Sequence, residues 1–272
     1  MDRTASLAPN LPTVSRLGLA TRGGSGLRPE DVEHAIARGV NYLNWCGHPD
    51  GMSQTIAHLG TARRNLVVAV QFQSRNSRHA VREFESYLKQ LKTDYLDAAT
   101  LYYVESGEEW SAITAPHGSW EFLDTQKRAG RLRLIGLTTH QRPLAAMWAQ
   151  TGLLDLLMIR YNAAHRGAEK DVFPVTSQLG IPVVTFTALR WGALPNPTPE
   201  DPSGVQLPTP ADCYRFCLAN RNVAVVLMAP ASRPELESDL ALFDDWRPPS
   251  AAEREAIRAH GERVRRTAGT FW

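Results

Sequence analysis

The chain has 272 residues, of which 43% are hydrophobic, and a formal net charge of +2 at pH 7. That length supports one large α/β domain with a buried core, and the near-neutral charge argues against a surface for nucleic acid or anionic membranes. No apolar run approaches the length of a membrane span, and the N-terminal residues lack the apolar stretch of a signal peptide, so we expect a cytoplasmic protein.

Short apolar runs alternate along the chain with stretches of helical periodicity. The predicted strands span residues 16–19, 41–43, 66–72, 95–101, 132–137, 155–160, 182–187 and 224–228. The predicted helices span residues 29–38, 53–59, 78–91, 119–129, 143–150, 168–179, 209–219 and 234–243. Residues 66–70 are all apolar, which is typical of a parallel sheet buried on both faces. This alternation predicts a closed (β/α)8 barrel, the TIM barrel, as a single domain over residues 1–272.

An open, doubly wound sheet is the alternative architecture, but no Gly-x-Gly-x-x-Gly motif follows the first predicted strand. Two segments interrupt the alternation, residues 105–118 and residues 190–210. Both would lie at the C-terminal face of a barrel, where active sites are built, so they are candidate lids; plain surface insertions are the alternative. Residues 250–272 are predicted to form a C-terminal helix, 251–267, and a tail.

The three cysteines are Cys46, Cys213 and Cys217, and their spacing is neither that of a disulfide framework nor that of a zinc site. Cys213 and Cys217 lie on one face of a predicted helix, but two ligands are too few for structural zinc. We therefore expect buried thiols in a reducing compartment, and no metal.

Several further stretches carry information through their order and spacing: residues 14–19, 39–44, 53–60, 93–97, 130–136, 160–162, 179–184 and 227–240. In this order they are similar to stretches of the aldo-keto reductases, and the chain resembles that family over most of its length. Three of the family's catalytic stretches resemble the frame Gly39-Val-Asn-Tyr-Leu-Asn44 and the predicted strands that lead to Gln71 and Tyr102. The resemblance implies a (β/α)8 barrel and, in the family, hydride transfer from NADPH to a carbonyl.

In the family a Tyr donates the proton, Lys and Asp lower the pKa of that Tyr, and His orients the carbonyl. The resemblance places Asn44 at the Asp, the stretch His48-Pro49-Asp50 at the Tyr, Gln71 at the Lys and Tyr102 at the His. All four residue types are then replaced. Because an unsatisfied buried amide costs about 1–3 kcal/mol, polar replacements predict a pocket that still binds a polar ligand. Drift in an inactive enzyme is the alternative.

The cofactor positions implied by the resemblance are altered as well. Thr138 and Thr139 stand for the Ser-Asn pair that holds the nicotinamide amide, whereas Phe186 keeps an aromatic ring for stacking. Arg233 stands at the basic residue for the 2′-phosphate, but Asp239 adds a negative charge nearby. We therefore expect no cofactor, with NADPH as the alternative.

Protic side chains are expected to gather at the carboxyl ends of the second, third and fourth strands. The candidate catalytic residues are Asn44, His48, Asp50, Gln71 and Tyr102. His48 and Asp50 would form an acid/base pair, and Tyr102 would donate a hydrogen bond to a substrate carbonyl. The candidate substrate-binding residues are Trp45, Cys46, Tyr103, His140, Arg160, Asn162, Phe186, Arg190 and Trp191. A surface position for His48, simple packing for Cys46 and an internal ion pair for Arg160 are the alternatives.

The leading hypothesis is a repurposed aldo-keto-reductase-like enzyme that performs cofactor-independent acid/base chemistry on a small carbonyl-containing metabolite. Dehydration, isomerisation or cyclisation would suit the candidate residues, and secondary metabolism is one setting for such a step. The first alternative is an NADPH-dependent oxidoreductase that protonates its substrate through Tyr102 or His48. The second is a non-catalytic binding or regulatory subunit.

Overall fold

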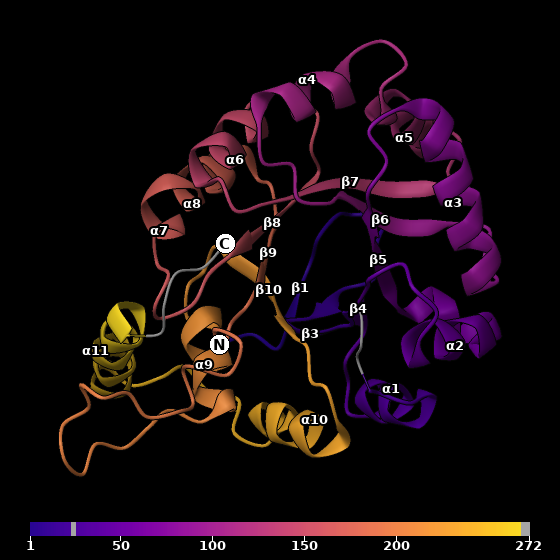
Figure 1. The fold of residues 1–272 in the computed structure, drawn as a ribbon. Coiled ribbons are helices and arrows are strands. Elements are labelled where there is room, and N and C mark those ends of the chain that lie inside the picture. The colour runs from indigo at the N-terminus through magenta and orange to yellow at the C-terminus, as the bar shows by residue number, and fades with distance from the viewer. Residues whose placement is uncertain (23–25, 268–272) are drawn as a thin grey trace.

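The computed structural model describes residues 1–22 and 26–267, and its parallel strands close into a barrel (Figure 1). The barrel strands are β3 (Leu17–Ala20), β4 (Tyr42–Trp45), β5 (Val67–Phe72), β6 (Leu96–Leu101), β7 (Leu132–Thr139), β8 (Leu156–Arg160), β9 (Val183–Phe186) and β10 (Val223–Met228). Strand β10 pairs with both β9 and β3 and so closes the sheet. The predicted (β/α)8 barrel is confirmed, and the open doubly wound sheet is wrong. A hairpin of β1 (Thr4–Ala5) and β2 (Val14–Ser15) precedes the barrel.

Helices surround the barrel strands (Figure 1). They are α1 (Pro29–Ala37), α2 (Gly51–His58), α3 (Ser77–Leu91), α4 (Gly107–Thr114), α5 (Ser119–Arg128), α6 (Arg142–Ala149), α7 (Ala168–Asp171), α8 (Phe173–Leu179), α9 (Pro210–Leu218), α10 (Arg233–Leu240) and α11 (Ala251–Thr267), with the 3-10 turns η1 (Gly60–Asn65) and η2 (Ala241–Phe243). Within the described part of the chain, no helix is both long and apolar enough to cross a membrane. The three cysteines are buried free thiols, as expected.

Alternate residues of each strand point into the barrel, and the residues between them face the helices. The apolar cluster inside the barrel contains Tyr42, Val67, Ala69, Ala98, Leu134, Leu156, Met158, Val184, Val225 and Leu227. This interior is tightly filled, since a Cβ on Gly136 would lie 2.8 Å from Cγ2 of Thr100. This packing leaves the layer at the carboxyl ends of the strands open to form a site.

Two elements differ from the sequence prediction. The segment 105–118 contains helix α4, because Ser106 caps it by accepting a hydrogen bond from the backbone N–H of Glu109. The predicted helix 168–179 is divided into α7 and α8 at Val172. Pro174 stands in the first turn of α8, where its missing N–H costs nothing, whereas it could not continue the helix before it.

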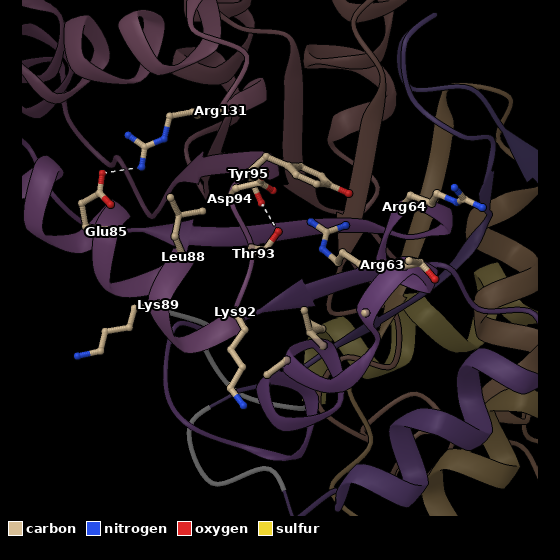
Figure 2. Close-up of a pocket in the computed structure, with 14 residues that line it drawn as sticks. Arg63, Arg64, Glu85, Leu88, Lys89, Lys92, Thr93, Asp94, Tyr95 and Arg131 are labelled. Atoms are coloured by element: carbon tan, nitrogen blue, oxygen red, sulfur yellow. Dashed lines mark hydrogen bonds and ion pairs between the residues drawn. The ribbon is translucent and has the colours of Figure 1, made fainter.

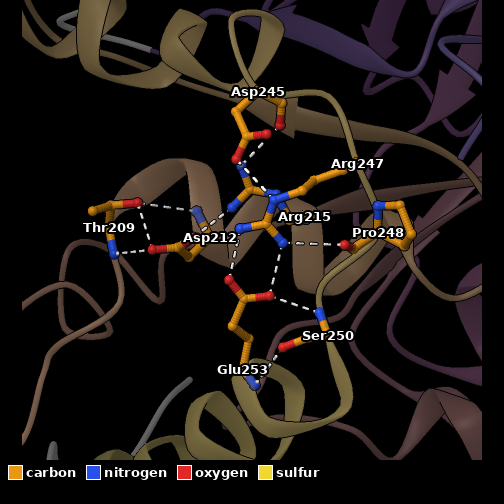
Figure 3. Close-up of polar contacts among 8 residues, drawn as sticks. All are labelled: Thr209, Asp212, Arg215, Asp245, Arg247, Pro248, Ser250 and Glu253. Carbon is orange, nitrogen blue, oxygen red and sulfur yellow. Dashed lines mark hydrogen bonds and ion pairs between the residues drawn. The ribbon is translucent and has the colours of Figure 1, made fainter.

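Ion pairs tie the C-terminal helix α11 to the barrel wall (Figure 3). Arg215 of α9 is buried, and its Nη2 lies 3.1 Å from Oδ2 of Asp245. Arg247 continues this network, with its Nη2 2.6 Å from Oε1 of Glu253 in the first turn of α11. Helix α11 spans the residues predicted for a C-terminal helix, and residues 268–272 of the predicted tail lie outside the described residues.

Candidate functional site

A cavity of about 580 Å³ opens at the carboxyl ends of the barrel strands. Residues at or near the ends of six consecutive strands, β4 to β9, line it: Asn44, Gln71, Tyr102, Thr138, Met158 and Phe186. Strand alternation explains this set, since each residue lies an even number of positions beyond an inward-facing residue of its own strand. The structure therefore brings Asn44, Gln71 and Tyr102 together, as the sequence predicted, and places Thr138 and Phe186, which were also expected at the site, beside them.

Two polar atoms at this cavity are buried without a partner. Asn44 is 1% exposed and Thr138 is 2% exposed, and neither Oδ1 of Asn44 nor Oγ1 of Thr138 has a hydrogen-bond partner among the described residues. Leaving such atoms unsatisfied costs about 1–3 kcal/mol each. Both residues line the same cavity, so a polar ligand bound there would lie beside them.

Tyr102 and Tyr103 form the aromatic side of the cavity at the end of β6. Their rings are stacked, with centroids 4.0 Å apart and planes at 27°. Burial, and next a hydrogen bond with Tyr103, raise the pKa of Tyr102 well above its ordinary value. The backbone of Tyr102 is fixed by a hydrogen bond, since Nη2 of Arg75 donates to the Tyr102 carbonyl oxygen over 2.7 Å. Tyr102 is thus a positioned phenol that stays protonated across the ordinary pH range.

His140 supports this aromatic side from behind. Its ring lies 4.5 Å from that of Tyr103 and 5.8 Å from that of Phe186, centroid to centroid. Oε1 of Glu105 lies 3.0 Å from Nδ1 of His140 and also accepts the His140 backbone N–H. His140 was expected to bind substrate, but it is absent from the cavity lining and instead positions Tyr103 and Phe186.

The loop after β9 forms the cavity wall in a strained conformation. Thr187, Arg190 and Trp191 have φ values of +61°, +53° and +53°, and Tyr103 across the cavity has +44°. A non-glycine residue in this region costs on the order of 1–3 kcal/mol, and such residues cluster at functional sites. Nδ2 of Asn162 donates to the Thr187 carbonyl oxygen over 2.8 Å and so holds the loop in place. Asn162, expected to bind substrate, is therefore a support for the loop.

The far end of the cavity is formed by α9, α10 and the turn after β10. Its lining residues there are Pro210, Tyr214, Ala229, Pro230, Glu235, Ser238 and Asp239. Asp239 is buried and hydrogen-bonded to Tyr214; burial raises its pKa to about 7, and the charge of Glu235 adds to the rise. Sequence reasoning named Asp239 only as a negative charge and missed Tyr214, which no local pattern marks as facing a cavity.

The expected His48–Asp50 pair does not form. His48 is exposed, and its carbonyl oxygen accepts a hydrogen bond from Nε1 of Trp45. Asp50 is the N-cap of α2, where its Oδ1 accepts the backbone N–H of Ser53 over 2.8 Å. The candidate acid/base pair is thus wrong, because one member lies in solvent and the other caps a helix.

Trp45 and Cys46 also lie away from the cavity. Trp45 follows Asn44 and so points to the outer face of the barrel, where its ring packs edge-on against Tyr87 at 5.1 Å. Sγ of Cys46 lies 3.5 Å from the hydroxyl of Thr21. Both were expected to bind substrate, and both are packing residues between barrel and helices. Trp191, by contrast, lines the cavity as expected.

Arg160 and Arg190, which were expected to bind substrate, lie outside the cavity lining as well. Burial and then the charge of Arg142 lower the pKa of Arg160 at the end of β8, and burial and then the charge of Arg160 lower the pKa of Arg190 after β9. Together with burial, Arg160 and Arg190 lower the pKa of His165 to about 4. They belong to a cationic cluster beside the cavity.

Two expected cofactor residues are engaged elsewhere. Oγ1 of Thr139 accepts the backbone N–H of Gln141 over 3.0 Å, on the opposite face of β7 from Thr138. Arg233 pairs with Oε1 of Glu237 at 2.7 Å and with Oδ1 of Asp31 at 3.4 Å. The lining instead contains Arg22, two positions beyond Ala20 of β3, which strand alternation would have indicated.

A second cavity, of about 820 Å³, lies at the opposite end of the barrel and is rich in basic residues (Figure 2). Its buried cation, Arg63, has Nη2 2.7 Å from Oδ2 of Asp97, and Arg131 pairs with Glu85 at 2.7 Å. The Tyr95 ring is flanked by Arg63. These pairs close the amino-terminal face, which in TIM barrels serves stability. Among the described residues no group of His, Cys, Asp and Glu is arranged to hold a metal ion.

Comparisons with known proteins agree with this architecture. The model of the Aldo/keto reductase family matches residues 28–210. The chain is 26% identical over 137 residues to the "Uncharacterized oxidoreductase YrpG" of Bacillus subtilis (strain 168), a match that covers 48% of this chain and only 40% of that protein. Among solved structures, the holo form of aldo-keto reductase AKR11C1 from Bacillus halodurans superposes with a TM-score of 0.77 at 19% identity. Its apo form gives 0.72 at 18% identity, and both matches cover 96% of each chain. At these identities the two structures show the fold.

Proposed function

Since the chain belongs to the aldo/keto reductase family, we propose that it is a nicotinamide-dependent oxidoreductase that reduces a small carbonyl compound in the cavity at the carboxyl ends of the strands. The observation that carries this proposal is the convergence on one cavity of a protonated phenol, Tyr102, with the unpartnered polar atoms of Asn44 and Thr138. The phenol is an acid, and the two other groups are sites for a polar ligand.

The cofactor-independent chemistry that was the leading hypothesis from the sequence lacks its expected base. Proton abstraction beside a carbonyl needs a basic group within hydrogen-bond reach of the substrate. His48 is exposed and Asp50 caps α2. The carboxylates that do line the cavity belong to α10, where Glu235 accepts the backbone N–H of Ala231 and Asp239 is hydrogen-bonded to Tyr214. The geometry therefore favours reduction, in which the protein supplies an acid.

The lining residues fit a nicotinamide cofactor. The ring of Phe186 offers a stacking face, and Thr138 offers a hydroxyl to an amide or carbonyl group. From Phe186 the same cavity continues along Thr187, Ala188 and Leu189 to α10, so an extended molecule has room beyond its reacting end. When bound, a reduced nicotinamide supplies a hydride to the carbonyl carbon.

The residues of the chain then protonate and orient the carbonyl oxygen of the substrate. The phenol of Tyr102 donates its proton to the carbonyl oxygen, so the product is an alcohol and the phenolate is reprotonated by solvent. The side-chain amides of Asn44 and Gln71 can donate hydrogen bonds that orient the carbonyl. Because the pKa of Tyr102 is raised, the phenol carries its proton at neutral pH, and the same rise makes it a weaker acid than an ordinary tyrosine.

A binding titration followed by an activity screen tests the proposal. Purified protein is titrated with NADH and with NADPH, and tryptophan fluorescence, to which Trp191 at the cavity contributes, reports binding. We expect saturable binding of a reduced dinucleotide and its oxidation by one class in a panel of aldehydes, ketones and quinones. If neither dinucleotide binds, the proposal is wrong, and cofactor-independent chemistry or a binding role takes its place.

A further inference from the structure

The end of the cavity at α10 is acidic. Glu235, Ser238 and Asp239 line this end of the cavity. They are three and four positions apart in α10, so they lie on the same face of the helix. Asp239 is 3% exposed, so its carboxylate is largely shielded from solvent. Among the described lining residues Arg22 alone carries a positive charge, and it follows β3. An anionic group placed against α10 therefore meets the carboxylate of Glu235 and, at a pH above its raised pKa, that of Asp239.

The basic residue nearest to these carboxylates along the chain is held outside the cavity. Nε of Arg233 lies 2.7 Å from Oε1 of Glu237, and its Nη1 lies 3.4 Å from Oδ1 of Asp31. Asp31 has a side chain that is 4% exposed, so withdrawing Arg233 would leave a buried carboxylate with less compensation. His34 adds a further contact to Glu237 at 3.1 Å and fixes this network between α1 and α10. Arg233 is thus committed to joining two helices.

Backbone donors in the turn before α10 are also engaged. The N–H of Ala231 donates to Oε2 of Glu235 over 2.8 Å, and Pro230 has no N–H to offer. Ser232 caps α10 by accepting the N–H of Glu235. The backbone of this turn therefore has few free donors, and Ser238 and Asp239 line the cavity next to it.

The course of a dinucleotide through the cavity follows from the proposed function, on which this inference rests. With the nicotinamide against Phe186, the cavity lining continues through Thr187, Ala188 and Leu189 and also includes the residues of α10. A dinucleotide laid along this path places its adenosine ribose at the acidic end. A free 2′-hydroxyl can donate a hydrogen bond to a carboxylate, as in sites that select NAD, whereas a 2′-phosphate is repelled there.

We propose that the protein selects NADH over NADPH, and that Asp239 and Glu235 are the residues that determine this specificity. The carboxylates accept hydrogen bonds from the adenosine ribose and exclude a phosphate on it. Arg233 takes no part, because its guanidinium is held by Glu237 and Asp31.

Equilibrium binding tests the inference without any assumption about the substrate. The dissociation constants of NADH and NADPH are measured by calorimetry at low and at high salt. We expect NADH to bind at least about tenfold more tightly at low salt, and the ratio to shrink as salt screens the carboxylates. Asp239→Asn and Glu235→Gln should each raise the affinity for NADPH more than that for NADH. Gln keeps an oxygen for the Ala231 N–H, so Glu235→Gln remains informative should Asp239→Asn fail to fold.

Glu85→Gln is the matched control, since Glu85 lies at the opposite end of the barrel and should change neither constant. NADPH binding as tightly as NADH, or more tightly, would overturn the inference and leave the proposed oxidoreductase standing. Equal effects of Asp239→Asn and Glu85→Gln would overturn the assignment of the specificity residues. Failure of both dinucleotides to bind would reject the inference together with the proposed function.

Discussion

The rings of Tyr102 and Tyr103 lie 4.0 Å apart in a stacked pair, and burial together with their mutual hydrogen bond raises the pKa of Tyr102. This relationship gives the cavity a phenol that is fixed in place and remains protonated. It places an acid at the end of β6, on a different strand from β4, whose following loop the family resemblance had indicated.

Replacing Tyr102 by Phe should remove the proton donor and leave the stack with Tyr103 intact. We expect kcat for carbonyl reduction to fall by about a hundredfold or more, the usual contribution of a general acid, with the dinucleotide dissociation constant unchanged. Steady-state kinetics and a binding titration check the two quantities. Tyr95→Phe, at the opposite end of the barrel, is the control. Full activity in Tyr102→Phe would remove Tyr102 from the mechanism.

Thr138 and Thr139 should respond in opposite ways to loss of the hydroxyl. Thr138→Val removes a buried oxygen that has no partner, so the free energy of unfolding should stay the same or rise by about 1 kcal/mol while ligand binding weakens. Thr139→Val removes the acceptor of the Gln141 N–H and should lower the free energy of unfolding by about 1–2 kcal/mol. Denaturant unfolding and ligand titration of both variants check this. Destabilisation by Thr138→Val would show that its hydroxyl already has a partner.

Asp239 should make the protein less stable as pH rises. Its pKa is raised from 3.8 to about 7 in the folded chain, so between these values the folded state binds more protons than the unfolded state. Stability attributable to Asp239 is therefore full below the lower value and lost as pH rises to the higher one. Asp239→Asn cannot titrate, and the difference in unfolding free energy between it and the wild type should change over this range. A difference that is constant with pH would contradict the shift.

Asp201 should anchor the segment after β9 to α11. Its Oδ1 lies 3.1 Å from Nδ1 of His260 and 2.6 Å from Nε of Arg263, and Nε2 of His260 contacts the Leu194 carbonyl oxygen at 2.9 Å. Asp201→Asn leaves two basic groups without their carboxylate, so we expect a loss of about 3 kcal/mol and faster hydrogen exchange in residues 190–202. Its neighbour Glu200 forms an exposed pair with Arg266, so Glu200→Gln should cost less than about 1 kcal/mol.

The contacts of the Asp201 carboxylate with α11 should be lost at acidic pH. Burial alone would raise the pKa of Asp201, but hydrogen bonds from the Thr198 N–H and from Arg263 outweigh it and lower the pKa to about 2. The folded state then binds fewer protons than the unfolded state below the ordinary value of 3.8, so the stabilisation is present above that value and lost as pH falls toward 2. The protection factors of residues 190–202, which correct for the pH dependence of intrinsic amide exchange, should fall over that range in the wild type and not in Asp201→Asn.

What the sequence determined by itself was the barrel and the inner face of its strands. The alternation of inward-facing and outward-facing residues along a strand is a local property, so the apolar runs predicted the strands. The same alternation predicted that Asn44, Gln71 and Tyr102 face one cavity. The sequence also contains the signal for a helix N-cap at Asp50, since Ser53 follows it at the spacing of a capping box. The family resemblance instead led to the prediction that Asp50 is a catalytic residue.

Only the tertiary structure decided which residues near the strand ends reach the cavity. The orientation of a loop depends on contacts with remote segments: Asn162 holds Thr187, and Arg233 is held by Asp31 from another helix. Tyr214 and Asp239 meet because α9 and α10 pack together, a relation that no periodicity encodes. Local patterns determine the direction of a strand side chain, whereas the boundaries of a binding cavity come from packing between elements far apart in the chain.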